Sequence, residues 1–386
     1  MRIAIYGGNG MVPQQEFADP RRMLAGALRA ILLCLLLFAV AGCGKRPGTE
    51  VLYPHPDAAA PARTVTIYVA TTREPAENRV EGYTREREDE LSYAEFVISI
   101  PPNHVPGEIE WPLSRKARPD EDFTVLRHTA LSRAAFDSRI GRAARESGKA
   151  AMFVHGFNVS FQEAVFRIAQ LSADSNISGV PILFSWPSQA RIFDYVTDKE
   201  SATFSRDGLT DVLQQVTGQP GVRSVLLFGH SMGGWLTMEA LRQLSLEGDV
   251  KALKKLNVIL AAPDIDEDVF ATQVDAIGPL DPPMMVMVSS DDYALRVSRL
   301  LQGNRQRAGQ FDITDPEVVE AAKKMNILLL DISSISSTDA LRHSRYTAMA
   351  SLYKELEDTD DMVSSGFRQA GGRFFEPAQA AATPSP

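Results

Sequence analysis

The chain has 386 residues, a formal net charge of −9 at pH 7, 44% hydrophobic residues and two cysteines. This length and apolar content suffice for one large domain with its own core, and Cys34 and Cys43 are too few for a disulfide framework. The acidic balance argues against nucleic acid and anionic lipid headgroups as partners.

The N-terminal segment carries the pattern of a secretion signal. An apolar run covers residues 30–41, and three arginines lie between residues 21 and 29. The run is shorter than the about 20 residues that a membrane-spanning helix needs, so it fits the apolar region of a signal peptide. We predict a signal peptide over residues 1–42, with residues 1–20 as an extension from an upstream start codon.

The predicted signal ends in Val40-Ala41-Gly42-Cys43, which is similar to the lipobox of bacterial lipoproteins. The similarity implies that Cys43 is acylated and becomes the first mature residue, with the Pro/Ala-rich residues 43–63 as a tether. Gly44 is not the aspartate associated with inner-membrane retention. We therefore expect a lipid anchor in the bacterial cell envelope, on the periplasmic side of the outer membrane. The alternative is an ordinary secretion signal with an incidental cysteine.

Strand and helix patterns alternate over residues 64–358, which we take as one domain. Continuous apolar runs predict leading strands at 64–70 and 91–100 and core strands at 150–154, 180–184, 222–228, 258–262, 284–290 and 325–330. Apolar residues at helical spacing predict helices over 161–176, over 201–216 and from 235 onward. The alternation predicts an α/β fold with a doubly wound, mainly parallel sheet and helices on both faces, because strands covered on both faces are apolar throughout.

Two segments are expected to lie outside the regular structure. The Arg/Glu-rich residues 80–90 are predicted to be a solvated connection. Residues 359–386, which are rich in Gly, Ala and Pro, are predicted to be a disordered tail.

The strand at 150–154 runs directly into His155-Gly156-Phe157-Asn158. A strand that ends in His-Gly upstream of a serine motif matches the loop that supplies one oxyanion-hole N–H group in serine hydrolases of this architecture. We assign this N–H group to Phe157. On its own the dipeptide would mark only the end of a strand, so the assignment depends on the serine motif that follows.

Gly229-His230-Ser231-Met232-Gly233 lies between the strand at 222–228 and the helix from 235. A serine on a sharp strand-to-helix turn has a strained backbone with its hydroxyl above the sheet, and glycines flank it because side chains there would collide with the turn. The Met232 N–H group, at the start of the helix, points toward an oxyanion forming on a substrate. The pattern predicts Ser231 as the nucleophile and Met232 as the second oxyanion donor.

The hydroxyl of Ser231 needs a general base, and histidine is the usual one. Of the six histidines, His155 and His230 belong to the two loops above, and the three upstream of residue 150 precede the core strands. His343 follows the last predicted strand, in a Ser/Thr-rich loop where this architecture places its base. We therefore predict His343 as the base.

Three aspartates compete for the role of the acid that orients His343. The strand at 284–290 is followed by Asp291-Asp292, and Asp292 gives the chain order Ser, Asp, His that is typical of α/β-hydrolases. Asp291 is its neighbour, and one of the two would cap the following helix. Asp264 ends the preceding strand and opens an acidic helix start. We favour Asp292, with Asp264 and Asp291 as alternatives.

Five motifs together resemble one bacterial family of α/β-hydrolases, long labelled a domain of unknown function and also described as "esterase/lipase superfamily enzyme". They lie at residues 153–158, 184–188, 229–233, 262–266 and 290–295, and the resemblance covers roughly residues 64–358. It implies the α/β-hydrolase fold and a serine nucleophile, but it names no substrate.

These residues predict a serine hydrolase, most simply a carboxylic-ester hydrolase that forms an acyl-enzyme with short or medium acyl esters. Residues 265–283 and the other core connections are too short for a large cap domain, so we expect an open site. We expect a small-molecule or lipid-like ester substrate, membrane contact through Cys43, and no cofactor, metal or nucleic acid. A thioesterase, amidase or peptidase would use the same residues. An envelope lipoprotein that uses the fold for binding is the alternative from another class.

Overall fold

The computed structural model describes residues 46–56, 58, 63–112, 118–175, 179–335, 337 and 341–347. The chain divides after Arg46 into two compact units, and the fold described here is that of the second, Pro47–Pro386. The predicted signal peptide, Cys43 and the tail lie outside the described residues and stay predictions. In the described part of the chain, the helices are all too short or too polar to cross a membrane.

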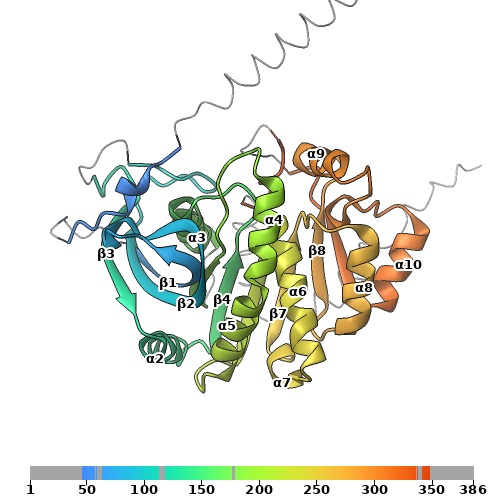
Figure 1. Cartoon of the computed structure of the whole chain (residues 1–386), viewed down its shortest axis with the longest axis horizontal. Helices are drawn as coiled ribbons and strands as arrows, with labels where there is room; N and C mark the ends of the chain where they lie inside the picture. The colour runs from blue at the N-terminus through green and yellow to red at the C-terminus, as the bar shows by residue number, and fades with distance from the viewer. Residues whose placement is uncertain are drawn as a thin grey trace, which may run out of the picture. The chain divides into compact units, whose positions relative to one another are not determined.

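A single sheet of nine strands forms the centre of the described fold (Figure 1). The strands are β1 (Thr64–Pro75), β2 (Tyr83–Ser99), β3 (Thr124–Leu131), β4 (Lys149–Val154), β5 (Val180–Ser185), β6 (Ser224–His230), β7 (Leu256–Ala261), β8 (Met284–Val288) and β9 (Ile327–Asp331). Their order is β3-β2-β1-β5-β4-β6-β7-β8-β9. All neighbours pair in parallel except β2, which is antiparallel to both β1 and β3.

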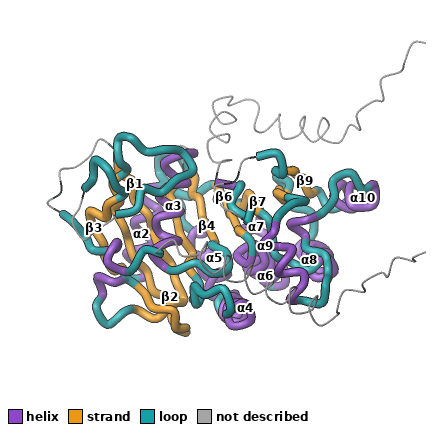
Figure 2. Tube along the Cα trace, turned by 90° about the horizontal axis from the view of Figure 1, so that it is seen from above, coloured by secondary structure: helices purple, strands orange, loops and turns teal. Residues whose placement is uncertain are grey.

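Helices cover both faces of this sheet. The α-helices are α2 (Arg133–Ala143), α3 (Phe161–Ser175), α4 (Tyr195–Phe204), α5 (Arg206–Gly218), α6 (Met232–Leu246), α7 (Val250–Leu253), α8 (Glu267–Ile277), α9 (Tyr293–Leu301) and α10 (Pro316–Lys324). Short 3₁₀ turns are η1 (Thr49–Leu52), η2 (Arg79–Glu81) and η3 (Ala308–Gln310). Side chains alternate along each strand, so Met152 packs with α5, α6 and α8 on one face, while Phe153 packs with α3 on the other. Figure 2 shows α5, α6 and α8 along one side of the strands.

This architecture confirms the predicted α/β fold, with a mainly parallel sheet covered on both faces. Within the described residues no insertion forms a separate cap domain. The connection from β8 to β9 folds as α9, η3 and α10.

Three expectations about local structure were wrong or incomplete. Residues 83–90 are not a connection but the first half of β2, with Arg87 paired to Arg73 of β1 and charged side chains facing solvent. The helix expected over 201–216 is two helices, because the Ser205 hydroxyl is tied to the Ser201 carbonyl at 2.8 Å and to Thr72 of β1 at 2.7 Å. In the predicted tether, η1 buries Leu52 completely, so packing begins before Thr64.

The carboxyl ends of the parallel strands position the candidate site. His155 follows β4, Ser231 follows β6, Asp264 follows β7 and Asp292 follows β8, while His343 comes after β9. In open parallel sheets these ends meet at one edge, where ligands bind. The sequence therefore brings five separated segments to one place.

Candidate active site

Ser231 stands at the sharp turn between β6 and α6. Its backbone has φ 54° and ψ −121°, a left-handed conformation that costs a non-glycine residue free energy. The end of β4 approaches this turn so closely that a side chain at Gly233 would collide with the carbonyl oxygens of Val154 and His155. Met232 is the first residue of α6, and the first N–H groups of a helix have no partner within the helix.

The loop after β4 packs directly against this turn. A Cβ atom added to Gly156 would lie 3.0 Å from the Cβ atom of Ser231 and 3.0 Å from Nδ1 of His230. His155 stacks on Trp186 at 4.9 Å between ring centroids, and its Nε2 lies 3.2 Å from the Ser185 hydroxyl. Burial lowers the pKa of His155 to about 3, so its ring is neutral and packs against Trp186 as an uncharged side chain.

A buried carboxylate holds the rest of this loop. Asp198 of α4 accepts hydrogen bonds from the Asn158 N–H at 3.2 Å, the Gln189 N–H at 2.6 Å and the Ser188 hydroxyl at 2.6 Å. The Ser188 oxygen in turn accepts the Val159 N–H at 3.2 Å. Asn158 has φ 60°, so Asp198 stabilises an unusual conformation one residue after Phe157.

Arg73 of β1 supports the same loop from the other side. It is completely buried and donates to the Val159 carbonyl at 3.2 Å, the Ser188 carbonyl at 3.4 Å and the Ser185 hydroxyl at 3.0 Å. Burial lowers the pKa of Arg73 to about 9, against the opposing charge of Asp198. The guanidinium therefore remains charged at neutral pH and joins two loop segments to the Ser185 hydroxyl that contacts His155.

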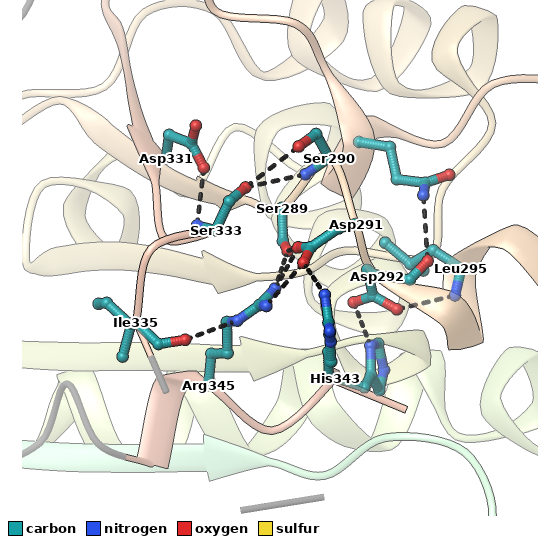
Figure 3. A network of polar contacts seen from close by, with 12 residues as sticks. Ser289, Ser290, Asp291, Asp292, Leu295, Asp331, Ser333, Ile335, His343 and Arg345 are labelled. Carbon is teal, nitrogen blue, oxygen red and sulfur yellow. Dashed lines mark hydrogen bonds and ion pairs between the residues drawn. The ribbon is translucent and has the colours of Figure 1, made fainter. Parts of the chain in front are cut away.

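Asp292 and His343 come together although 51 residues separate them (Figure 3). Oδ2 of Asp292 lies 2.6 Å from Nδ1 of His343, and Oδ1 accepts the Leu295 N–H at 3.0 Å as the N-cap of α9. Asp292 is fully buried, while the His343 side chain is only 15% exposed. One carboxylate thus caps a helix and holds the imidazole.

His343 also lies next to the serine turn. Its ring centroid is 4.6 Å from that of His230, the residue before Ser231, and its carbonyl oxygen is 3.4 Å from Nε2 of His230. Burial, together with the charge of His343, depresses the pKa of His230 well below its usual value. His230 is therefore neutral, and its ring packs against that of His343.

Asp291 holds the loop that carries His343. Its carboxylate pairs with Arg345 at 2.5 Å and accepts the Ser289 hydroxyl at 3.0 Å (Figure 3). It also pairs with Arg342 at 2.6 Å, so the two arginines that it binds lie on either side of His343 in the sequence. Hydrogen bonds from Arg345 hold the pKa of Asp291 well below its usual range. Arg342 has φ 57°, so these ion pairs stabilise an unusual backbone next to the imidazole.

Asp264 faces other partners. It accepts hydrogen bonds from the Tyr195 hydroxyl at 2.7 Å and the Ser298 hydroxyl at 2.6 Å, and it lies 3.5 Å from Nε of buried Arg307. Its backbone N–H donates to the Ser231 carbonyl at 3.2 Å. Asp264 thereby joins α4 and α9 beside the serine turn, and its carboxylate is already occupied by these partners.

The structure therefore brings Asp292 and His343 together beside Ser231, with the loops of Phe157 and Met232 around the same turn. It separates the three candidate acids by their partners: His343 for Asp292, arginines for Asp291, and Tyr195 with Ser298 for Asp264. Sequence reasoning missed Asp198 and Arg73, and it left open which of Asp291 and Asp292 caps α9, which the structure shows to be Asp292. The motif at 184–188 includes Ser188 and was the one available signal for the Asp198 network. Among the described residues no cluster of His, Cys, Asp or Glu is built to hold a metal ion.

The fold and the strained serine turn define an α/β-hydrolase. A profile of the family described as "Alpha/beta hydrolase of unknown function (DUF900)" matches residues 132–359, more than half of the chain, so this chain belongs to that family. The predicted family resemblance is thereby confirmed. No curated protein matches the sequence.

Solved structures with similar folds include several esterases. The catalytic core of acetyl xylan esterase from Trichoderma reesei is 11% identical, with 57% of this chain and 97% of that chain covered and a TM-score of 0.30. A lidless α/β serine hydrolase from Xanthomonas campestris is 15% identical, with 75% and 92% covered and a TM-score of 0.30. An esterase from Thermogutta terrifontis is 14% identical, with 71% and 88% covered and a TM-score of 0.32. At these scores the likenesses support no inference about this chain.

Proposed function

We propose that this chain is a serine hydrolase that cleaves carboxylic esters of short or medium acyl chains. The observation that carries the proposal is the 2.6 Å contact between Asp292 and Nδ1 of His343, beside a serine with φ 54°. A carboxylate on Nδ1 fixes the tautomer in which Nε2 accepts a proton. Burial of the carboxylate strengthens its effect on the imidazolium that forms during the reaction.

In the proposed reaction the Ser231 oxygen forms a bond to the ester carbonyl carbon while its proton passes to Nε2 of His343. The N–H groups of Met232 and Phe157 stabilise the oxyanion of the tetrahedral intermediate. The intermediate collapses with cleavage of the ester C–O bond, and the alcohol leaves with the proton from His343. Water then attacks the acyl-enzyme, again with His343 as base, and releases the acid and free Ser231.

Hydrolysis of a panel of p-nitrophenyl esters with different acyl lengths, with a thioester and an anilide beside them, tests the proposal. Replacement of Ser231 by Ala should reduce hydrolysis to background. Asp292→Asn keeps an oxygen to cap α9 but leaves the wrong imidazole tautomer, so kcat should fall roughly 10⁴-fold. Asp264→Asn is the matched control, because this carboxylate is also buried beside Ser231 but contacts Tyr195 and Ser298.

Two results would contradict the proposal. Undiminished hydrolysis in Ser231→Ala would rule out Ser231 as the nucleophile, whereas a parent protein that hydrolyses none of the substrates would favour the use of the fold for binding. A large loss in Asp264→Asn with little loss in Asp292→Asn would show that the acid has been assigned to the wrong strand. Faster cleavage of the thioester or the anilide than of every oxygen ester would reassign the substrate class.

A further inference from the structure

The helix that begins at Asp292 presents its apolar side to solvent. Tyr293, Val297, Leu300 and Leu301 stand at helical spacing along one exposed stripe of α9, and Leu300 is 70% exposed. The inward side carries Leu295 and the polar Ser298. A surface helix normally faces its apolar stripe to the core, so α9 is reversed.

A second exposed apolar group lies beside it, at the start of α4. Ile192, Phe193 and Val196 project there, and the Phe193 side chain is 95% exposed. The Tyr195 hydroxyl lies 3.2 Å from the Ser298 hydroxyl, which joins this segment to α9. The Tyr195 ring also packs against Phe157 at 5.3 Å, so both apolar groups adjoin the loops of the candidate site. We call this surface the apolar rim; it consists of the side chains of Ile192, Phe193, Val196, Tyr293, Val297, Leu300 and Leu301.

Basic side chains without acidic partners accompany the apolar rim. Arg191, Arg296 and Arg299 form no ion pair with a carboxylate in the described part of the chain. Arg296 instead packs over the Tyr293 ring at 5.2 Å. On the neighbouring segment Asp194 and Glu200 are the carboxylates that are not buried, since Asp198 is buried and bound to the loop after β4. The net charge of −9 for the whole chain therefore hides a local surplus of unpaired arginines at this edge.

We propose that the apolar rim docks on an anionic lipid surface and seats the mouth of the site at the bilayer interface. Exposed apolar side chains flanked by arginines fit the boundary between acyl chains and anionic headgroups. A second copy of the chain fits less well, since a two-fold interface would place the same unpaired arginines against one another. Docking does not require catalysis by Ser231, so a test of docking can succeed or fail independently of the proposed esterase activity.

Insertion of single tryptophans into the full chain tests this surface. Phe193→Trp places the probe on the apolar rim. Leu246→Trp is the matched control, because Leu246 is 61% exposed but ends α6, about 21 Å along the helix from Met232. Figure 1 shows α9 and the α7 region that follows Leu246 at opposite ends of the sheet. Both variants carry Ser231→Ala so that no lipid is consumed.

The probes are mixed with vesicles of phosphatidylcholine and phosphatidylglycerol that have brominated acyl chains. The emission of the unsubstituted protein is subtracted to remove the three native tryptophans. We expect a blue shift and bromine quenching at position 193 and neither at position 246. A protein held to vesicles by the predicted N-terminal anchor gives the same contrast, because the comparison is between two faces of the same bound molecule. Equal quenching at both positions, or none at 193, would overturn the proposal.

The charge of the lipid tests the arginines separately. Arg191→Gln and Arg296→Gln, each in the Phe193→Trp background, should lower the partition constant for anionic vesicles, measured from quenching against lipid concentration, about fivefold. Arg145→Gln should leave it unchanged, because Arg145 lies between α2 and the start of β4, at the end of the strands away from the candidate site. Equal docking on pure phosphatidylcholine would refute the charge complementarity. A blue shift that grows with protein concentration in the absence of vesicles would reassign the surface to self-association.

Discussion

Replacement of Asp198 by Asn tests whether a buried carboxylate outside the proposed triad holds the oxyanion loop. Asp198 accepts hydrogen bonds through both oxygens, from Gln189 on Oδ1 and from Asn158 and Ser188 on Oδ2. An asparagine in its best orientation keeps the Oδ2 partners but turns its amide N–H toward the Gln189 N–H. At least one charge-assisted bond is lost, which costs about 1.5–3 kcal/mol.

The loss extends to Arg73, whose buried charge no longer has the opposing charge of Asp198. We therefore expect the free energy of unfolding to fall by about 2–4 kcal/mol, which corresponds to a Tm lower by roughly 5–10 °C. A less constrained Phe157 N–H weakens the oxyanion hole, where loss of one complete donor costs about 10²–10³ in kcat. The expected decrease in kcat for a short p-nitrophenyl ester is about 10- to 10³-fold, with KM nearly unchanged.

The assay compares Asp198→Asn with Asp194→Asn by thermal unfolding and by steady-state hydrolysis. Asp194 precedes α4, makes no side-chain cap hydrogen bond, and loses the same charge, so its variant should stay within about 0.5 kcal/mol of the parent. A folded Asp198→Asn protein with kcat within about threefold of the parent would show that Asp198 does not hold the oxyanion loop. Equal losses in both variants would attribute the effect to net charge and not to the loop.

Three further predictions follow from the same contacts. Asp291→Asn weakens both ion pairs that flank His343, so kcat should fall about 10-fold and a melting curve should show a lower Tm. Arg342→Gln leaves the pair with Arg345, so its decreases in kcat and Tm should be smaller. Gly156→Ala places a methyl group 3.0 Å from Cβ of Ser231, so kcat/KM should fall at least about 10-fold, and an unchanged value would show that the turn relaxes freely. Burial opposes protonation of His104, but the hydrogen bonds that its ring donates to Asp174 and Glu110 outweigh it and raise the pKa of His104 above its usual 6.5. Its stabilisation is thus complete below pH 6.5 and lost as the pH rises through the folded pKa, so urea unfolding should show the parent's advantage over His104→Asn shrinking from pH 6 to pH 9.

Much of the fold was predictable because its strands are buried on both faces. The apolar runs at 150–154, 180–184 and 222–228 have no competing interpretation, and β4, β5 and β6 match them within two residues. The failures occur where exposure on one face removes that signal. Residues 83–90 of β2 form a strand with solvated Arg and Glu side chains, and their composition alone resembles a loop.

The candidate site was predictable only in part, because residues that follow strand ends have positions fixed by topology. Ser231, Asp292 and His343 are of this kind. Asp198 is not, since its role depends on which side of α4 faces the loop after β4. The choice among Asp264, Asp291 and Asp292 likewise needed coordinates, because all three lie at strand ends and each could cap a helix or hold an imidazole.

The rate of phosphonylation tests the central claim most directly, that His343 makes the Ser231 hydroxyl reactive. The full chain is treated with a fluorophosphonate, and the modified peptide and its rate of appearance are followed by mass spectrometry in the parent, Ser231→Ala and His343→Gln proteins. We expect one phosphonyl group on Ser231, no labelling in Ser231→Ala, and a rate in His343→Gln lower by at least about 10³-fold. Labelling of His343→Gln at the parental rate, or labelling of the parent at another residue, would contradict it.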